Sequence, residues 1–408
     1  MAVIRPITKT KAITNLRRIG YIVHAYDISH HVYVKLERLI SLTHLHFNEL
    51  LNLKRFWYLI CVVKNINKET KTMDIVRASA QFLQTVTPVF PRKVRGLVTF
   101  GYQALSLQRI QSVNSNARSV NLNRKTAESR AYRLAKSQLL RQAFPRLIDK
   151  LGLVQNGDHI AVDFSDFGIV QALMFAKRTD GGRALPIWFK VLPYGWTKET
   201  SQNAWVNQAI SEFMETVGVH VMLVFDRGFA APTIVEYLCR QDILFVVRIK
   251  GDKKVLGRKG GTKARWLPAG LHPVWLYGNR LNLVVTPEPD GDSEPWYLVT
   301  NNLGLTTETV TIIYYHRFEI EEVFKDAKHL FGLEYIQFKL PERLTTILWF
   351  VCLGFWLHDY LERTIVSSRT VVQKAKQGLV QSRTHYWLEQ IKHALQAEAL
   401  ATIAGAGR

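Results

Sequence analysis

The stretch HIAVDFSDFGIVQALMFAKRTDGGRALPIWFKVL, residues 159–192, decides the fold. Its apolar residues form three runs that are typical of β-strands, at 159–164, 169–176 and 185–192. The last two runs are separated by residues 179–182, Thr-Asp-Gly-Gly, and an Asp-Gly-Gly turn between apolar runs indicates a β-hairpin. We therefore expect the chain to enter its sheet through three strands of antiparallel type.

Beyond residue 200, helices are predicted to alternate with strands. Helical periodicity occurs at 204–216 and 231–239, and strand-like runs occur at 219–225 and 243–249. Three antiparallel-type strands followed by such an alternation is the element order of a ribonuclease-H-like fold, an α/β fold with a mixed sheet and helices on both faces. Residues 250–300 add a basic loop and further strand-like runs, so we expect a β-rich insertion there.

Two aspartates stand where strands of this sheet are predicted to end. Asp163 lies at or near the end of the first strand, and Asp226 directly follows the apolar run of the fourth. These strands can be neighbours in a mixed sheet, so the two carboxylates would converge on one hard cation, although aspartates are also common in ordinary loops. Asp166 is a rival to Asp163, but three residues further along a strand it would point to the other face, which leaves it a helper or no role.

The segment YYHRFEIEEVFKDAK, residues 314–328, predicts a helix with one unusual face. At about 100° per residue, four of its side chains fall within one stripe, whereas Glu319 lies on the opposite side. The stripe consists of Tyr314, Arg317, Glu321 and Lys328. A solvated surface with an Arg317–Glu321 pair is the plainer interpretation. A tyrosine and two cations around one carboxylate fit better with a metal ligand bracketed by phosphate contacts.

These residues resemble a known family. The stripe has two, three and six residues between its members, which matches the YREK signature of the bacterial cut-and-paste transposases in the superfamily of insertion sequence type four. Family-like context surrounds the two aspartates, in VDFSDFG and VFDRGFA, and precedes the stripe, in WYLVTNN. The resemblance covers about residues 159–335. Phe318 stands where the family usually has tryptophan, a difference expected to affect packing and not activity.

The resemblance implies a DDE transposase with a ribonuclease-H-like core. Asp163, Asp226 and Glu321 would be its catalytic acidic triad and would hold two Mg²⁺ or Mn²⁺ ions. Such ions suit in-line phosphoryl transfer, because one activates the attacking hydroxyl and the other stabilises the leaving oxygen. The implied reaction is binding of terminal inverted repeats, cleavage of the element ends and joining of their 3′-hydroxyl ends to target DNA.

The resemblance also implies residues that contact DNA. Those in the stripe are Tyr314, Arg317 and Lys328. Trp296 opens the WYLVT run, the place at which relatives supply an aromatic ring that stacks on a base flipped out of the duplex. A tryptophan in a strand is more usually a core residue, and Trp266 and Trp275 of the same insertion compete for the role.

Nearly all of the excess positive charge lies in the N-terminal part of the chain. The 408 residues have a formal net charge of +21, and residues 1–150 contain 26 Lys and Arg but only 7 Asp and Glu. A solvated basic surface normally carries more acids, so we expect this part to bind nucleic acid. A basic amphipathic helix is predicted at 124–144, and two shorter helices could form at 95–107 and 107–113, so residues 95–144 are a possible helix-turn-helix unit. Its candidate DNA contacts are Arg124, Lys125, Arg130 and Arg133.

Composition excludes several classes of protein. A hydrophobic content of 47% argues against a disordered chain. The cysteines Cys61, Cys239 and Cys352 are isolated from one another, which excludes a disulfide scaffold and a cysteine-ligated zinc ribbon and fits a reducing cytoplasm. The family resemblance implies that this is the cytoplasm of a bacterium and that the protein is associated with the nucleoid. The longest apolar run, 347–357, is too short to span a bilayer, so we expect a buried core helix and no membrane partner.

We expect five regions along the chain. They are a basic DNA-binding region at 1–150, the first part of the catalytic core at 151–249, the insertion at 250–300, the catalytic helix with the end of the core at 301–360, and C-terminal helices at 361–408. Cut-and-paste transposition holds two DNA ends together, so the family implies a homodimer in a synaptic complex. The amphipathic stretch 373–404 is a candidate for dimerisation, although covering the core is its more ordinary role.

A function of a different class is DNA binding without catalysis, as in a domesticated repressor derived from a transposase. A protein that needs only affinity could lose Glu321 without penalty, so the intact triad favours the enzyme. Structure-specific nucleases share the fold, but they do not account for the basic N-terminal part combined with the YREK spacing.

Overall fold

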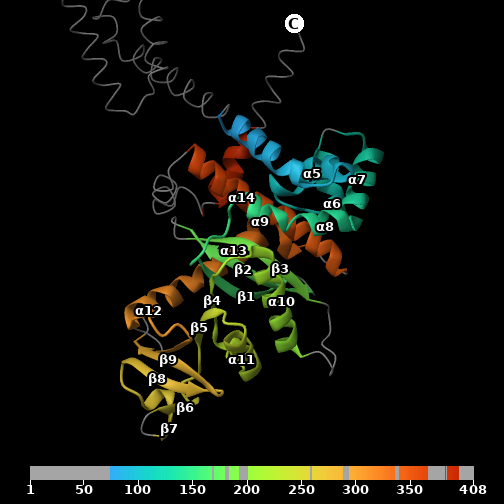
Figure 1. Cartoon of the computed structure of the whole chain (residues 1–408). Coiled ribbons are helices and arrows are strands. Elements are labelled where there is room, and N and C mark those ends of the chain that lie inside the picture. The colour runs from blue at the N-terminus through green and yellow to red at the C-terminus, as the bar shows by residue number, and fades with distance from the viewer. Residues whose placement is uncertain are drawn as a thin grey trace, which may run out of the picture. The chain divides into compact units, whose positions relative to one another are not determined.

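The computed structural model describes residues 74–120, 122–167, 170–179, 183–192, 201–257, 260–287, 294–335, 340–365, 382 and 384–394. Cys61, the tip of the expected turn at 179–182 and most of the stretch 373–404 lie outside the described residues. The chain divides into two compact units, Met1–Val76 and Arg77–Arg408. Almost all described residues belong to the second unit, whose fold is given below and shown in Figure 1.

This unit is built on a 10-stranded mixed sheet with the strand order β3-β2-β1-β4-β5-β10-β9-β8-β6-β7. Strands β1, β4 and β5 are parallel to one another, and the other neighbouring pairs are antiparallel. The strands are β1 (His159–Phe167), β2 (Val170–Arg178), β3 (Ala184–Leu192), β4 (Met222–Phe225), β5 (Leu244–Arg248), β6 (Lys254–Gly257), β7 (Gly260–Lys263), β8 (Gly270–Leu276), β9 (Asn279–Thr286) and β10 (Trp296–Thr300). All strands expected between residues 159 and 249 are therefore present.

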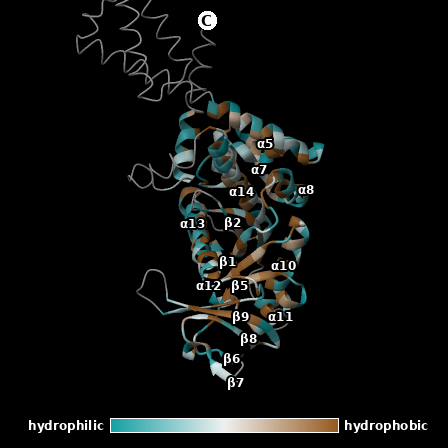
Figure 2. Cartoon of the chain, turned by 60° about the vertical axis from the view of Figure 1, so that its left-hand side comes forward, coloured by the Kyte–Doolittle hydropathy of each residue, from teal (hydrophilic) through white to brown (hydrophobic). Residues whose placement is uncertain are grey.

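The expected β-rich insertion at 250–300 forms strands, but they extend the central sheet. β10 pairs with β5 through Val299 and Val247, and β9, β8, β6 and β7 follow outward from it. Figure 1 shows these strands at the end of the sheet remote from α14. In Figure 2 the hydrophobic colour is concentrated on the strands, as expected for a sheet that helices cover.

The helices follow the helical residues 74–86. They are α5 (Arg95–Gly101), α6 (Val113–Ser119), α7 (Arg124–Lys136), α8 (Gln138–Ala143), α9 (Arg146–Lys150), α10 (Gln202–Val217), α11 (Pro232–Arg240), α12 (Thr307–Tyr315), α13 (Glu319–Lys325) and α14 (Pro341–Thr364). The two helices expected at 204–216 and 231–239 are thus confirmed as α10 and α11.

Alternation along the central strands sorts side chains between two helical layers. Successive residues of a strand point to opposite faces. Met222 and Val224 of β4 join a buried cluster with residues of α12. Phe225 lies in the same row of the sheet as Phe175 of β2, whose ring stacks on Phe213 of α10 with 4.4 Å between centroids. Helix α12 therefore covers one face of the sheet and α10 covers the other.

The basic N-terminal helices pack on α14. Phe144, at the end of α8, stacks on Trp349 of α14 with 5.4 Å between ring centroids. The Ser106 hydroxyl donates to the carbonyl oxygen of Phe350 at 2.6 Å. Residues 77–150 consequently share a core with the sheet-bearing part of the chain.

Two expectations for these helices are wrong. The single helix predicted at 124–144 is divided into α7 and α8, because Ser137 adopts an extended backbone and its hydroxyl accepts from the Leu140 N–H as an N-cap. The short helix predicted at 107–113 is absent, and α6 begins only at Val113, where Ser112 provides the cap.

Helix α14 contains the apolar run at 347–357 and is buried there, as expected. Within the described residues it is the one helix long and apolar enough to cross a membrane by length and composition, and 89% of its apolar window is buried inside the protein. The indole N–H of Trp356 donates to the carbonyl oxygen of Pro186 in β3 at 2.7 Å. These contacts make α14 the core helix that joins the N-terminal helices to the sheet.

The described part of the C-terminal stretch is a helix at 384–394. Tyr386, Trp387, Leu388 and Ile391 are buried within this chain, and the Trp387 indole N–H donates to Glu362 of α14 at 3.1 Å. Leu395 lies outside the described residues. The packing side chains of this helix therefore cover the core.

Candidate active site

Two neighbouring parallel strands bring two aspartates together, Asp163 in the middle of β1 and Asp226 directly after β4. The expectation that Asp163 lies at or near the end of the first strand is wrong, because β1 continues beyond its pairing with β4 and forms a hairpin with β2 as far as Phe167. Val162 of β1 is the register partner of Phe225 of β4, and the next residues are Asp163 and Asp226. Val162 and Phe225 face the layer of α10, so alternation turns the two carboxylates toward the layer of α12. The expectation that the first and fourth strands are neighbours is confirmed.

The segment opposite these aspartates is helical but irregular. The single helix expected at 314–328 consists of the end of α12, a 3₁₀ turn at His316–Phe318, α13 and a π-helical turn at Asp326–Leu330. Despite the changes of pitch, Tyr314, Arg317 and Glu321 share the side that faces the sheet. We call these three residues the front face.

Hydrogen bonds join the front face to the two aspartates. The Tyr314 hydroxyl donates to Oδ1 of Asp226 at 3.1 Å. Arg317 donates through Nη1 to Oδ2 of Asp163 and through Nη2 to Oε1 of Glu321, both at 3.0 Å. The structure thus brings together all three acids of the expected triad and two members of the stripe.

Electrostatics at this cluster are dominated by burial and by crowded charge. Burial raises the pKa of Asp163, and the charges of Asp226 and Glu321 raise it further, against the opposing effect of Arg317. Burial opposes the charge of Arg317, but its neighbours, with Tyr314 first and then the carboxylates, outweigh burial and raise its pKa. Burial also raises the pKa of Tyr314 to about 12, so its hydroxyl stays a donor at neutral pH.

Aromatic rings support the front face from behind. Trp296 of β10 packs edge-on against Tyr314, with 4.8 Å between ring centroids, and lies 6.0 Å from the ring of Phe318. The Arg317 guanidinium lies 4.3 Å from the centroid of the Phe318 ring. Phe318, the departure from the family pattern, therefore keeps an aromatic contact with the arginine.

Trp296 is a core residue in this structure. Its side chain is 1% exposed, so its ring is not available for stacking on a DNA base. The expectation that Trp296 contacts a flipped base is therefore corrected: in this structure it is a core residue. Its burial follows from its position in β10, between the sheet and α12. The competing Trp266 and Trp275 are 65% and 53% exposed, at the outer end of the sheet.

The remaining predicted residues lie apart from the cluster. Lys328 is half-buried, with Nζ 5.8 Å from the centroid of the Phe167 ring, whereas Asp166 is exposed and accepts a hydrogen bond from Gln171 at 2.9 Å. The four basic residues predicted to contact DNA lie on α7, three of them exposed and Arg130 half-exposed. They are Arg124, Lys125, Arg130 and Arg133. The outward position of Asp166 agrees with the expectation that it faces away from Asp163.

The acids fit a divalent metal ion by chemistry. Carboxylate oxygens are the ligands that Mg²⁺ and Mn²⁺ prefer, and Asp163, Asp226 and Glu321 provide three. Within the described residues, no three His, Cys, Asp or Glu side chains are gathered closely enough to hold an ion. The guanidinium of Arg317 lies between Asp163 and Glu321 and keeps their carboxylates apart. The crowding that raises the pKa of Asp163 is what a bound cation would relieve.

The opposite side of the helical segment is attached to the sheet by ion pairs that the sequence did not predict. The carboxylates of Glu319, Glu322 and Asp326, which we call the back face, pair with basic side chains. Their partners are Arg178, Arg183, His316 and, through a longer contact of 3.8 Å with Glu322, the exposed Lys325. The acidic spacing i, i+3, i+7 was the available signal for this face, but nothing near it in the sequence points to the two arginines of the β2–β3 hairpin.

Comparison with known proteins places a transposase domain over this site. Residues 180–357 match the sequence model of the transposase DDE domain, a segment that is less than half of the chain, contains Asp226 and the front face, and begins after Asp163. No curated protein matches the chain. A solved structure of a piggyBac transposase synaptic complex with hairpin DNA is 13% identical and covers 80% of this chain and 70% of that chain, with a TM-score of 0.38, too low to support a common fold. The domain match supports a transposase of the DDE type.

Proposed function

We propose that the protein is a cut-and-paste DNA transposase of the YREK-bearing superfamily of insertion sequence type four. It would bind terminal inverted repeats, cleave the element ends and join their 3′-hydroxyl ends to target DNA by metal-dependent phosphoryl transfer. The observation that carries the proposal is the convergence of Asp163, Asp226 and Glu321 on Arg317 and Tyr314, from segments far apart in the sequence.

The sheet supports a ribonuclease-H-like core for this enzyme. Its first five strands follow the order β3-β2-β1-β4-β5, with β1 to β3 antiparallel and β4 and β5 parallel to β1. In open sheets with parallel strands, ligands bind at the carboxyl ends of the strands. Asp226 lies at that end of β4, and Asp163 lies beside it in β1, directly after the last residue of β1 that pairs with β4.

Asp163, Asp226 and Glu321 would hold two Mg²⁺ or Mn²⁺ ions. Divalent ions bound there would supply Lewis-acid stabilisation to the phosphodiester that is cleaved or joined. The protein's own side chains arrange the site. Tyr314 orients the carboxylate of Asp226, and Arg317 orients those of Asp163 and Glu321.

DNA contacts complete the proposal. Lys328 lies further along the same segment and is proposed to bind a phosphate group of the element end. Tyr314 and Arg317 are 0% and 3% exposed, as buried as Trp296, so the DNA contacts expected of these two residues need the same correction. The basic side chains of α7 supply further phosphate contacts. Synapsis would require a homodimer, and the reaction would take place on the bacterial nucleoid in the cytoplasm.

The test is an excision assay in a donor plasmid that carries both ends of the element. We expect purified protein with Mg²⁺ or Mn²⁺ to release the element and to join it to a target plasmid. Binding of the ends without cleavage under any divalent metal would favour the alternative, a catalytically silent DNA-binding protein. Asp226→Asn is the matched control, because it removes one carboxylate charge at nearly the same volume.

A further inference from the structure

The back face is anchored to the sheet by one arginine. Arg183 donates through Nη1 to Oδ2 of Asp326 at 2.6 Å, and its Nη2 lies 3.3 Å from Oε2 of Glu322. Glu322 and Asp326 are four residues apart and lie one turn from each other, on the side away from Glu321. A single guanidinium thus bridges two consecutive turns of the segment that carries Glu321.

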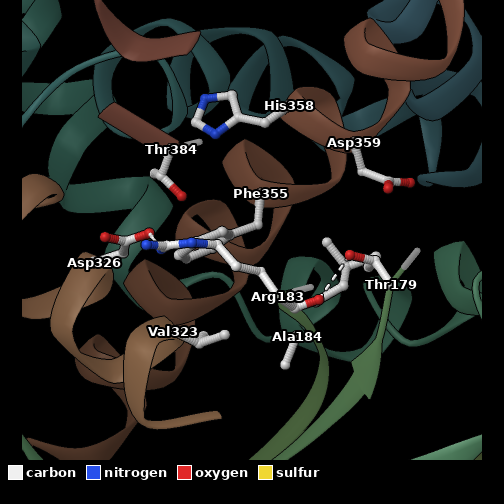
Figure 3. Close-up of a pocket in the computed structure, with 10 residues that line it drawn as sticks. Thr179, Arg183, Ala184, Val323, Asp326, Phe355, His358, Asp359 and Thr384 are labelled. Atoms are coloured by element: carbon white, nitrogen blue, oxygen red, sulfur yellow. Dashed lines mark hydrogen bonds and ion pairs between the residues drawn. The ribbon is translucent and has the colours of Figure 1, made fainter. Parts of the chain in front are cut away.

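Arg183 links that segment to the strand that carries Asp163. It immediately precedes β3, which pairs with β2, which in turn pairs with β1. Figure 3 shows its side chain reaching from the strand to Asp326. The triad comes partly from the sheet and partly from the helical segment, so a tether between the two sets the position of Glu321 relative to Asp163.

The ion pair between Arg183 and Asp326 is largely enclosed by neighbouring side chains, and we call this contact between the sheet and the helical segment the joint. The side chain of Arg183 is 22% exposed and that of Asp326 is 7% exposed. Val323 of α13, Phe355 of α14 and Thr384 help to line a cavity of about 30 Å³ around the pair. That volume has room for water but is too small for a substrate.

Asp326 depends on its partner because it is buried. Burial raises its pKa, and the charge of Arg183, followed by hydrogen bonds with Thr384 and Ser382, acts in the opposite direction. Although the contact of 2.6 Å is short, burial is the larger effect. Removal of Arg183 would leave this buried carboxyl group at the joint without a counter-charge, held only by its hydrogen bonds with Thr384 and Ser382, and the segment would move to relieve it.

We infer that Arg183 is a positioning residue, which sets the place of Glu321 by fixing Asp326 and Glu322 to the sheet. The inference rests on the proposed function, in which Glu321 belongs to the catalytic triad. Groups that orient metal ligands from behind typically matter about 10- to 100-fold for metal affinity or activity. Arg178 contributes a second, longer contact, with Nε 3.7 Å from Oε1 of Glu319.

The test compares three variants of the full chain. In Arg183→Gln we expect the cleavage rate to fall about 10-fold or more and the Mn²⁺ concentration for half-maximal cleavage to rise, with end-DNA binding unchanged. Hydrogen exchange should accelerate in residues 319–330 but not in β1 or β4. In Arg183→Gln combined with Asp326→Asn, two neutral amides replace the ion pair, and we expect most of the rate and of the protection to return. Lys325→Gln removes an exposed charge from α13 and should resemble the wild type.

Each outcome decides the inference. It is overturned if Arg183→Gln cleaves as fast as Lys325→Gln, or if exchange accelerates equally in the helical segment and in β1 and β4, as expected of a residue that only stabilises the whole fold. It is also overturned if the double variant is no better than the single one. If the wild-type chain cleaves no DNA, the proposed function fails, whereas the exchange measurement still tests the tether.

Discussion

The two sides of the segment from Tyr314 to Leu330 meet similar residues in different charge balance. On the side of the front face, three carboxylates surround one arginine, and those of Asp163 and Glu321 share it. On the back face, three carboxylates meet two arginines and a histidine. Ion pairs at the back hold the segment to the sheet, whereas the front has more carboxylates than cations, as the proposed role of its acids as metal ligands requires.

The contribution of each ion pair depends on how deeply its partners are buried. Arg317 is 3% exposed, and its ion pair with Asp163, which is 23% exposed, is little weakened by solvent. Glu321 is 55% exposed, so its pair with Arg317 contributes less. The back-face acid Glu322 is 44% exposed, so its contact with Arg183 contributes little stability. The pair between Arg183 and the buried Asp326 contributes most of the attachment of the segment to the sheet. Both faces therefore depend on one arginine each, the buried Arg317 at the front and the partly buried Arg183 at the back.

The largest effect is expected from the acids at the front. Asp163→Asn, Asp226→Asn and Glu321→Gln should each reduce cleavage and joining below detection while leaving end-DNA binding intact. The melting temperature without metal should stay the same or rise, because each change relieves crowded negative charge. Cleavage assays with parallel thermal unfolding check this. A variant that still excises the element would remove its residue from the triad.

The second prediction concerns Arg317→Met. Unlike the changes at the acids, this change should lower the stability of the protein. Without the guanidinium, three carboxylates face one another without a counter-charge, so we expect loss of cleavage and a destabilisation of about 3–5 kcal/mol without metal. Mn²⁺ should then raise the melting temperature of the variant more than that of the wild type. Equal stabilisation of the two proteins by Mn²⁺ would show that the acids do not gather around a cation.

Much of this comparison follows from local sequence patterns. The strands from 159 to 249 and the position of Asp226 directly after β4 could be predicted, because alternation and turn residues act over a few positions. The continuation of β1 beyond Asp163 to Phe167 could not, because it depends on pairing with β2. The front face could be predicted because Tyr314, Arg317 and Glu321 remain on one side although the segment changes pitch. The break at Ser137 could not, since a serine side chain that caps a helix competes with helical hydrogen bonds in a way that periodicity does not reveal.

The back face escaped prediction for a different reason. Arg183 and Asp326 are 143 residues apart, and only the folded hairpin places them together. Trp296 shows the same limit, because its WYLVT context fits either a core strand or a DNA contact. Burial by α12, a segment that follows it in the chain, decides between them.

The third prediction concerns that tryptophan. Trp296→Ala removes a fully buried ring beneath Tyr314, so we expect a destabilisation of about 3–5 kcal/mol and a parallel loss of cleavage. Trp266→Ala removes a ring that is 65% exposed and should leave the melting temperature unchanged. Thermal unfolding of both variants is the measurement. If Trp296→Ala were as stable as the wild type and failed only in second-strand processing, the ring would act on DNA after leaving the core.

The fourth prediction separates buried from exposed charges on the helical segment. Glu319 was expected to be an inert residue opposite Glu321, but its side chain is only 14% exposed and accepts from Nδ1 of His316 at 2.8 Å. Glu319→Ala should therefore cost about 1–3 kcal/mol by leaving the histidine and Arg178 without this partner. Lys325→Ala, with a side chain that is 65% exposed, should change stability by less than about 0.5 kcal/mol. Equal effects would mean that the back face does not hold the segment.

The smallest effect is expected outside both faces, on α7. Removing residues 1–150 would not isolate DNA binding, because Phe144 and Ser106 pack on α14 and their loss would open the core. Single changes are cleaner. Lys125→Ala or Arg133→Ala alters an exposed side chain, so stability and the cleavage rate of bound ends should remain, while end affinity falls and the slope of log affinity against log salt becomes smaller by about 1. Binding isotherms at several salt concentrations measure that slope. An unchanged slope in both variants would move the phosphate contacts away from α7, and a lower cleavage rate at saturating DNA would connect α7 to the front face.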